Sequence, residues 1–428
     1  MNRRTLLKTI GTGSLLTVPA LAATAQAAAA PADAANLLPI DPARWSAFNA
    51  GEINRFLQTV GKASPNYNPQ KKPYAVFDWD NTCIMNDCEE ALFMYQIEHL
   101  AFKLSPDEFA SVVRQGVPNG PFAADYKNVD GKPVLMEDIA ADVEADYRWL
   151  HANFKGMAGS QSLEQIQASE QVKDLRPKLE FRYDAICDSQ PIEVGYKWVI
   201  YFFKNMSPAE VQAMTEASND ANLGDALRKG KLASSDKLPG KAGQISASHF
   251  FGLRIHTEMA TLMHTLRANG IDVYVSTASL DDVVRVFAGN AKYGYNVPAE
   301  NVIGLRLEMK DGKYDSVYRK GWHFNWGPGK TVGINNVLVA SKGYGPAMVL
   351  GDSDGDAWML KDFADTKLGV VVNRLKKGEI GERSKSAAEA IGKTGARYIL
   401  QGRNEHTGIF LPDEKTLKYG KTEAKLLA

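Results

Sequence analysis

Cysteine is nearly absent from this chain of 428 residues, which holds only Cys83, Cys88 and Cys187. Three cysteines cannot form the paired framework of a small disulfide-stabilised protein, and their spacing does not match a structural zinc site. Cys83 and Cys88 are close enough in sequence to leave one bridge open, but we do not expect it. The seven histidines are scattered without a His-Glu-x-x-His motif, so we assign none of them to a metal.

The sequence also lacks an excess of either charge. Its 50 basic residues match its 50 acidic ones, which leaves no basic footprint for nucleic acid or for an anionic membrane surface. We therefore expect no nucleic-acid partner. No internal repeat or low-complexity segment follows the N-terminal region, and the length is enough for two or three domains with a sizeable core.

A long hydrophobic run is missing as well. The apolar stretch near the N-terminus, residues 10–23, is short and is interrupted by Gly11, Gly13 and Pro19, so we expect no stable membrane anchor. This stretch follows paired arginines and precedes small residues that suit a signal peptidase, a pattern similar to a twin-arginine export signal. Residues 1–27 are therefore predicted to be a signal peptide that engages the twin-arginine translocase, and the mature protein to be periplasmic or secreted.

Strand and helix patterns alternate through the C-terminal half of the chain. Such alternation predicts an α/β fold with a Rossmann-like, doubly wound parallel sheet. We place this core at residues 71–91 and 251–428, preceded by an N-terminal extension at 28–70. Helix patterns dominate residues 92–250, which are predicted to form a large, mainly helical cap inserted into the core. Within the cap, the Lys-, Ser- and Gly-rich stretch 230–243 is predicted to be an exposed loop.

Polar residues follow three of the predicted strands at the point where each strand ends. Asp78 and Asp80 come directly after the apolar run 74–77, Ser276 follows a second run, and Asp352 follows a third. Ligands of parallel sheets bind beyond the carboxyl ends of the strands, so these residues should converge in space. Two carboxylates buried side by side are unfavourable unless a cation neutralises them. The pair Asp78 and Asp80 therefore predicts a divalent metal and chemistry at this edge.

Four segments in a fixed order carry the strongest functional signal. They are Asp78-Trp79-Asp80-Asn81-Thr82, Val275-Ser276-Thr277, Lys330 and Gly351-Asp352-Ser353-Asp354-Gly355-Asp356. This set resembles the four-motif signature of haloacid dehalogenase superfamily phosphatases. The resemblance implies a phosphomonoesterase with a Rossmann-like core and a cap between the first and second motifs.

The resemblance also assigns the three aspartates of the reaction. Asp78 is similar to the nucleophile that forms an acyl phosphate, and Asp80 to the general acid and base. The implied cofactor is Mg²⁺, held by the Asp78 side chain, the Asp80 backbone carbonyl and the Asp352 side chain. Dehalogenases of the superfamily lack the second aspartate, so Asp80 favours phosphatase chemistry.

Five further residues have implied supporting roles. Ser276 and the Thr277 N–H bind phosphate oxygens, and Lys330 screens the charges of the nucleophile and the phosphoryl group. Thr82 braces the turn of the first motif, and Asp356 lies in the second shell or orients Lys330. Ordinary structural readings exist for Thr82 as a turn threonine, for Ser276 and Thr277 as a polar strand end, and for Lys330 as a surface lysine that opens a helix. Asp354 is an extra acidic residue of the fourth motif, for which a solvated loop charge is at least as good a reading.

The cap is expected to determine the substrate. A cap that closes over the site favours a small organic phosphate over a protein. Glu89 and Glu90, together with the aromatic run 196–203, suggest a cationic headgroup, because carboxylates and aromatic faces both attract quaternary ammonium. This arrangement resembles secreted bacterial phosphorylcholine phosphatases. In the alternative reading, the two glutamates merely lie in the first turns of a helix and the aromatic run belongs to the core.

Other activities stay open at this point. Phosphoserine phosphatases and acid phosphatases of broad specificity share the same motif order. An alternative of another class is a non-catalytic periplasmic protein that binds an amine or phosphate ligand on this scaffold. The intact motifs argue against it, because decayed scaffolds usually lose a nucleophile or a metal ligand.

Overall fold

The fold is built on a parallel sheet of six strands, in a computed structural model that describes residues 44–428. The strands, in sheet order, are β12 (Tyr398–Gln401), β11 (Leu368–Val372), β10 (Met348–Gly351), β1 (Tyr74–Phe77), β6 (Asp272–Leu280) and β7 (Val302–Leu305). Phe77 of β1 lies opposite Leu350 of β10 on one side and Val275 of β6 on the other. The strand before the two aspartates is therefore central, next to the strands that carry the second and fourth motifs.

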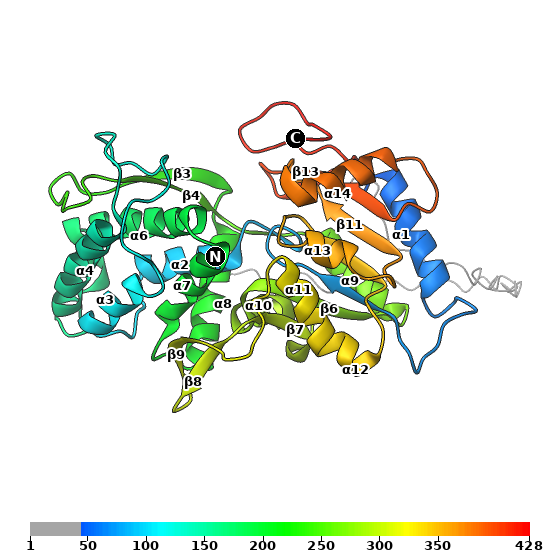
Figure 1. The fold of residues 1–428 in the computed structure, drawn as a ribbon, viewed down its shortest axis with the longest axis horizontal. Coiled ribbons are helices and arrows are strands. Elements are labelled where there is room, and N and C mark those ends of the chain that lie inside the picture. The colour runs from blue at the N-terminus through cyan, green and yellow to red at the C-terminus, as the bar shows by residue number, and fades with distance from the viewer. Residues whose placement is uncertain (1–43) are drawn as a thin grey trace, which may run out of the picture. The chain divides into compact units, whose positions relative to one another are not determined.

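Helices cover both faces of this sheet (Figure 1). On one side lie α1 (Ala47–Val60), α9 (Thr257–Ala268) and α10 (Asp281–Gly289); on the other lie α11 (Pro328–Ile334), α13 (Ala357–Lys361) and α14 (Gly378–Glu389). Alternate residues of β1 face opposite ways: Ala75 and Phe77 pack with the first group of helices, and Tyr74 and Val76 with the second. The predicted α/β fold with a doubly wound parallel sheet is confirmed.

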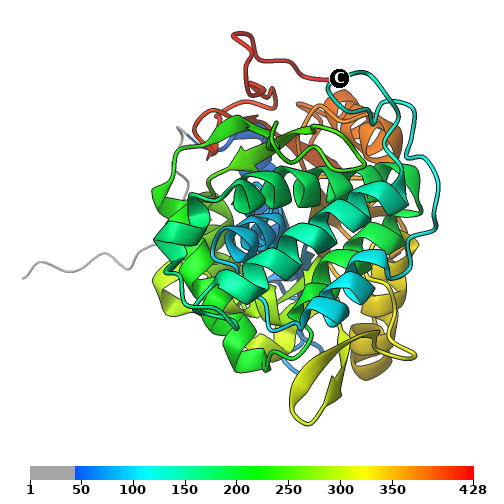
Figure 2. The same ribbon diagram turned by 90° about the vertical axis from the view of Figure 1, so that its left-hand side faces the viewer.

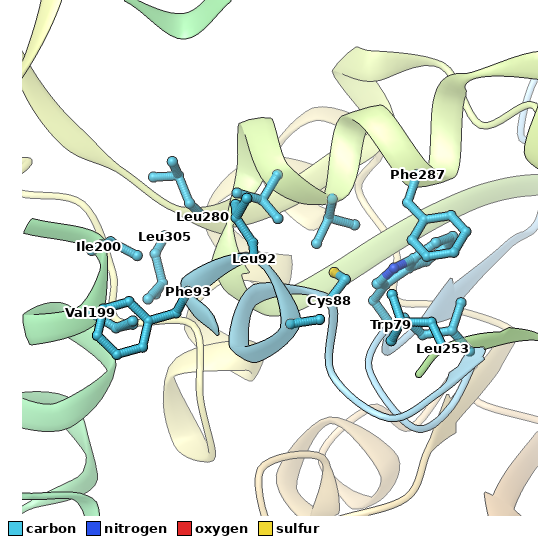
Figure 3. Packing of buried hydrophobic residues seen from close by; sticks show 14 of the residues in the cluster. Trp79, Cys88, Leu92, Phe93, Val199, Ile200, Leu253, Leu280, Phe287 and Leu305 are labelled. Atoms are coloured by element: carbon cyan, nitrogen blue, oxygen red, sulfur yellow. The ribbon is translucent and has the colours of Figure 1, made fainter. Parts of the chain in front are cut away.

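A second group of elements is inserted between β1 and β6, and most of them are helices (Figure 2). The chain passes through α2 (Cys88–Glu98), α3 (Pro106–Arg114), α4 (Met136–Asn153), α5 (Leu163–Gln167), α6 (Glu170–Ser189), α7 (Ile192–Ile200), the 3₁₀ turn Tyr201–Phe203 and α8 (Pro208–Gly224). Helix α2 joins the two regions, because its Phe93 packs against the aromatic rings of Trp198 and Phe202 in the cap. Figure 3 shows Phe93 directed toward Val199 and Ile200 of α7.

The cap also contains an antiparallel hairpin, so the predicted loop at 230–243 is wrong in part. Strand β3 (Arg228–Ala233) pairs with β4 (Ser246–Phe251), and the connection between them is largely held in place. Ser234 and Ser235 at its start are both 0 % exposed. The composition of this stretch resembles a solvated loop, but its backbone N–H and carbonyl groups are partners of buried charges in the cap helices.

Those buried charges form a cluster around Lys178 of α6. Its ammonium group lies 3.0 Å from Asp142 Oδ2 and 2.6 Å from Asp174 Oδ2, and it also donates to the carbonyls of Leu238 and Pro239. A lysine buried at 0 % side-chain exposure needs such partners, and the two carboxylates need the lysine. The cluster thereby ties α4, α6 and the β3–β4 connection together.

The remaining elements come from the core segments of the chain. They are β2 (Ile84–Met85), β5 (Arg254–Ile255), 3₁₀ turns at Ala291–Tyr293 and Ala299–Asn301, β8 (Leu307–Lys310), β9 (Lys313–Tyr318), the π-turn Asn335–Val339, α12 (Ala340–Lys342), β13 (Arg403–Asn404) and β14 (Ile409–Phe410). One of them, β9, also contacts the cap through the hydrogen bonds of Tyr314 with Asn205 and Met206. No helix within 44–428 is long and apolar enough to cross a membrane. The predicted signal peptide, residues 1–27, and the start of the predicted extension lie outside the described residues.

Replacing Lys178 with alanine should destabilise the cap strongly, because it leaves two buried carboxylates without a cation. We expect a loss of about 3–5 kcal/mol in the free energy of unfolding, measured by urea denaturation of the full chain. Lys173→Ala is the matched control on the same helix, since Lys173 is half exposed and its carboxylate partners are 3.5 and 3.7 Å away. It should change stability by about 0.5 kcal/mol or less. Equal effects of the two substitutions would contradict the proposed importance of the cluster.

Candidate active site

The first motif forms a turn that directs both of its aspartates away from the core. Asp78 continues β1 by one residue, since its N–H donates to Leu350 O at 3.0 Å. Trp79 between the aspartates points inward, with its ring 5.8 Å from that of Phe287 and 4.8 Å from that of Tyr295 (Figure 3). Asp78 and Asp80 therefore both line the cavity beyond the strand ends.

Lys330 reaches the nucleophile candidate from the third motif. Its Nζ lies 2.5 Å from Asp78 Oδ1 and 2.7 Å from Asp356 Oδ1, and its side chain is 2 % exposed. Burial disfavours the charged ammonium, but the carboxylates of Asp356 and Asp78 outweigh it and raise the pKa of Lys330. The lysine therefore stays a cation, and Asp356 holds it against Asp78 as the sequence predicts.

Asp352 lies beside Asp78 and shares a hydroxyl group with it. Thr82 Oγ1 is 2.8 Å from both Asp78 Oδ2 and Asp352 Oδ1, but its single proton can serve only one of them at a time. The other oxygen of Asp352 accepts from Arg374 Nη1 at 2.6 Å. Burial alone would raise the pKa of Asp352, but the Arg374 charge and these hydrogen bonds lower it. Burial, followed by the Asp356 charge, raises the pKa of Asp78 well above its ordinary value, against the effect of Lys330.

These residues fit a hard divalent cation. Carboxylate oxygens of Asp78, Asp352 and Asp356 lie within 4.8 Å of one another, and all three side chains are buried. The cationic side chains of Lys330 and Arg374 face these three carboxylates, so one negative charge is not balanced. The single proton of the Thr82 hydroxyl also cannot serve Asp78 and Asp352 at once. Oxygen ligands at such a site suit Mg²⁺. Asp356 is the least available of the three, because it already binds Lys330 and accepts from the Asp352 and Ser353 N–H groups.

Asp80 is fixed by two donors. Its Oδ1 accepts from the Cys88 N–H at 2.8 Å and its Oδ2 from the Ser279 hydroxyl at 2.8 Å. Burial nevertheless raises its pKa above the ordinary value of an aspartate, which favours a form that can donate a proton. Sequence reasoning missed Ser279, because β6 continues to Leu280 where the predicted strand stops at the second motif.

The second motif departs from the prediction at Ser276. This residue is 0 % exposed, and its hydroxyl accepts from Asn325 Nδ2 at 3.0 Å, so it does not line the cavity. Thr277, the next residue, does line the cavity, and Asn325 also donates to its carbonyl at 2.7 Å. Side chains alternate along a strand, so a shift of one residue exchanges a cavity position for a buried one. The structure thus places Thr277, and not Ser276, at the wall of the cavity.

Above these motifs the cavity, of about 370 Å³, is bounded by α2 and by aromatic residues of cap and core. Glu90 lines it with an accessible side chain, next to Asp87, which caps α2 by accepting from the Glu89 and Glu90 N–H groups. Enclosure in the cavity, then the neighbouring carboxylates, raises the pKa of Glu90 well above its ordinary value. Three aromatic side chains line the same cavity: Tyr183, Tyr196 and Trp326.

The two predicted substrate glutamates have different surroundings. Glu89 is 6 % exposed, and its Oε1 accepts from the Leu280 N–H at 3.0 Å, which fixes α2 to the end of β6. Glu90 has no such partner among the described residues and faces the cavity. Within the predicted aromatic run, Tyr196 lines the cavity, whereas Trp198, Phe202 and Phe203 are core residues.

Sequence reasoning also missed Arg374, although a signal for it exists. Asn373 and Arg374 directly follow β11, just as Asp352 follows β10, and the rule of strand ends applies to both. Tyr183 and Trp326 carried no comparable signal, because one lies inside a helix pattern and the other in an irregular segment before Lys330.

Comparison with known proteins supports a functional assignment. The chain matches no family model. It is 25 % identical over 377 residues to a phosphorylcholine phosphatase of Pseudomonas aeruginosa, which covers 81 % of this chain and 87 % of that protein. It is 34 % identical, with a TM-score of 0.83, to a crystal structure of a conserved protein of unknown function from Anaerococcus prevotii, covering 89 % of this chain and 98 % of that one.

The structure thus places Asp78, Asp80 and Asp352 at the end of a parallel sheet, with the buried Lys330 against Asp78, in the arrangement that the motif resemblance implies for a phosphatase. This arrangement and the similarity to the curated relative support a phosphatase of the haloacid dehalogenase type.

Replacing Thr82 with valine should show how strongly the carboxylates of Asp78 and Asp352 depend on a positive or hydrogen-bonding partner between them. The fully buried side chain keeps its volume, but Asp78 and Asp352 lose their shared donor. In EDTA we expect stability to fall by about 1–3 kcal/mol, measured by thermal unfolding. MgCl₂ should reduce this deficit, because a cation would supply the missing positive charge.

Thr331→Val is the control, since Thr331 only meets Asp362 on the surface. A Thr82→Val deficit that is the same in EDTA and in MgCl₂ would contradict a cation site between these carboxylates.

Proposed function

We propose that this phosphatase is a Mg²⁺-dependent phosphomonoesterase that acts on a small organic phosphate with a cationic headgroup, phosphocholine being the first candidate. The observation that carries the proposal is the cavity itself. Its lining combines Asp78 and Lys330 with the carboxylate of Glu90 and three aromatic side chains. The phosphorylcholine phosphatase activity of the curated relative supports the same substrate class.

The hydrolysis proceeds through a covalent aspartyl phosphate in this proposal. Asp78 attacks phosphorus, and the bond to the leaving oxygen breaks as Asp80 donates its proton to that oxygen. Asp80 then accepts a proton from the water that hydrolyses the acyl phosphate. Before the attack, Lys330 keeps the Asp78 carboxylate oriented and ionised. Mg²⁺, when bound by Asp78, Asp352 and the Asp80 carbonyl, supplies positive charge to the phosphoryl oxygens.

The carboxylates around Glu90 explain a preference for a cation. Burial raises the pKa of Glu90, and so do the negative charges of Asp87 and Asp80 on the core side and of Asp184 and Glu180 on α6. A trimethylammonium group would relieve this repulsion without donating a hydrogen bond, and aromatic faces attract it as well. Tyr183 and Tyr196 come from the cap, whereas Trp326 comes from the core, so the headgroup would lie between the two regions.

A phosphoserine-type substrate is the second candidate, and a specific observation favours it. Arg374 and Lys376 also line the cavity, and either would pair with the carboxylate of phosphoserine. A panel of phosphocholine, phosphoethanolamine, phosphoserine and sugar phosphates separates the two substrates.

We further propose that the enzyme acts outside the cytoplasm after export through the twin-arginine translocase. Support for this comes from the N-terminal sequence pattern alone.

Asp78→Asn should abolish turnover of an aryl phosphate while the protein stays folded, since the amide cannot form the acyl phosphate. We expect a loss of about 10⁴-fold or more in kcat, measured by release of the chromophore. EDTA should likewise remove the activity of the wild-type protein, and added MgCl₂ should restore it. Retained turnover in Asp78→Asn would refute the role of the nucleophile, and activity insensitive to EDTA would refute metal dependence.

Glu90→Gln should weaken selection for the cationic headgroup. We expect kcat/KM for phosphocholine, divided by that for an uncharged aryl phosphate, to fall about tenfold, since one enclosed carboxylate–cation contact is lost. Glu89→Gln is the neighbouring control, because glutamine can still accept from Leu280. The control should keep the wild-type ratio. Unchanged selectivity in Glu90→Gln, or a preference of the wild type for sugar phosphates, would exclude the cationic headgroup.

A further inference from the structure

Arg374 presents an incompletely used guanidinium group to the catalytic cavity. Its Nη1 donates to Asp352 Oδ2 at 2.6 Å, and this is the side chain's only hydrogen bond within residues 44–428. The side chain is 23 % exposed and lines the cavity together with Asp78, Thr277 and Lys330. Nε and Nη2 therefore remain as donors in the same space that must receive the phosphoryl group.

The backbone beneath Arg374 is built to hold it in place. Asn373 donates to the carbonyls of Glu414 and Leu426 at 2.8 Å each, and Lys418 donates to the Arg374 carbonyl at 3.1 Å. Leu375 has a φ of 53°, a left-handed conformation that is strained for a leucine. Strain of this kind persists only where the surroundings enforce it, and it often marks a functional position.

Arg374 belongs to the loop between β11 and α14, and the end of this loop at α14 is held by the fourth motif. Asp354 Oδ1 accepts from the Ile380 N–H at 2.8 Å and so caps α14, whose own first residues provide no side-chain cap. Gly378 allows this approach, because its φ is 78° and a Cβ would lie 2.4 Å from Asp354 Oδ2. Asp354 is therefore not merely a solvated loop charge. It fixes the distance between the loop of Arg374 and the carboxylate of Asp352.

The phosphoryl group needs the donors that Arg374 offers. Lys330 already gives two of its three N–H bonds to Asp78 and Asp356, and the Ser276 hydroxyl is turned away from the cavity. Arginine can bind two phosphate oxygens with its planar fork, which lysine cannot do. We propose that Arg374 is a further substrate-binding residue, whose free N–H groups bind the non-bridging oxygens of the phosphoryl group. This inference rests on the proposed phosphomonoesterase function.

The test uses inorganic phosphate as the probe, with the full chain in saturating MgCl₂. Isothermal titration of Arg374→Gln should show a phosphate Kd about 10- to 100-fold weaker than that of the wild type, because two charge-assisted hydrogen bonds are lost. Arg374→Lys should lie between the two, since it keeps the charge but not the fork. Lys376→Gln tests the other cavity cation and should change the Kd less. Titration with MgCl₂ alone measures the metal affinity of each variant.

Several outcomes would overturn the proposal. One is an unchanged phosphate Kd in both Arg374 variants, and another is a larger loss of phosphate affinity in Lys376→Gln. A third is a loss of phosphate affinity that weaker Mg²⁺ binding explains fully, which would make Arg374 a positioning residue for Asp352. Weakened phosphoserine binding with normal phosphate binding would assign Arg374 to the headgroup instead. Failure of the proposed substrate is distinguishable, because it would appear in the turnover of phosphocholine and leave the phosphate titration unaffected.

Discussion

The site depends on the burial of several carboxylates at the end of one sheet, and on the cations that make this burial possible. Asp78, Asp352 and Asp356 converge because the neighbouring strands β1 and β10 end at the same edge, with Asp352 and Asp356 both in the segment after β10. Lys330 and Arg374 neutralise part of their charge, and the remainder creates the demand for a metal. The positive charges that a phosphate dianion would meet in this cavity are those of Lys330 and Arg374, which also stabilise the buried carboxylates of the protein.

Helix α2 couples this chemistry to substrate choice. Its first N–H fixes Asp80, Glu89 fixes the helix to the end of β6, and Glu90 faces the headgroup side of the cavity. The proposed general acid, Asp80, and the proposed headgroup carboxylate, Glu90, are therefore both held by the same helix. A movement of α2 that improved the headgroup contact would also displace Asp80.

The sequence predicts the parallel core, the cap insertion and the four motifs, because strand ends and motif spacing are local patterns. It could not show which side chain of the second motif reaches the cavity, because the alternation along β6 buries Ser276 and leaves Thr277 at the wall. It reads the stretch 230–243 as an exposed loop, because composition cannot show that Lys178 supplies partners to its carbonyls. Trp326 and Tyr183 could not be predicted at all. Their place in the cavity is set by how the cap meets the core, which no local pattern encodes.

The central position of β1 has a consequence for how the chain folds. β1 is synthesised before the cap, yet both of its sheet partners, β6 and β10, are synthesised after it. The cap can form its own local contacts first, whereas the core must wait for a long loop closure and folds late. During that interval the strand Tyr74–Phe77 is an unpaired apolar segment next to two uncompensated carboxylates, and Lys330 arrives only near the end of synthesis. The central position of β1 therefore makes the chain most prone to aggregation while it is still being synthesised.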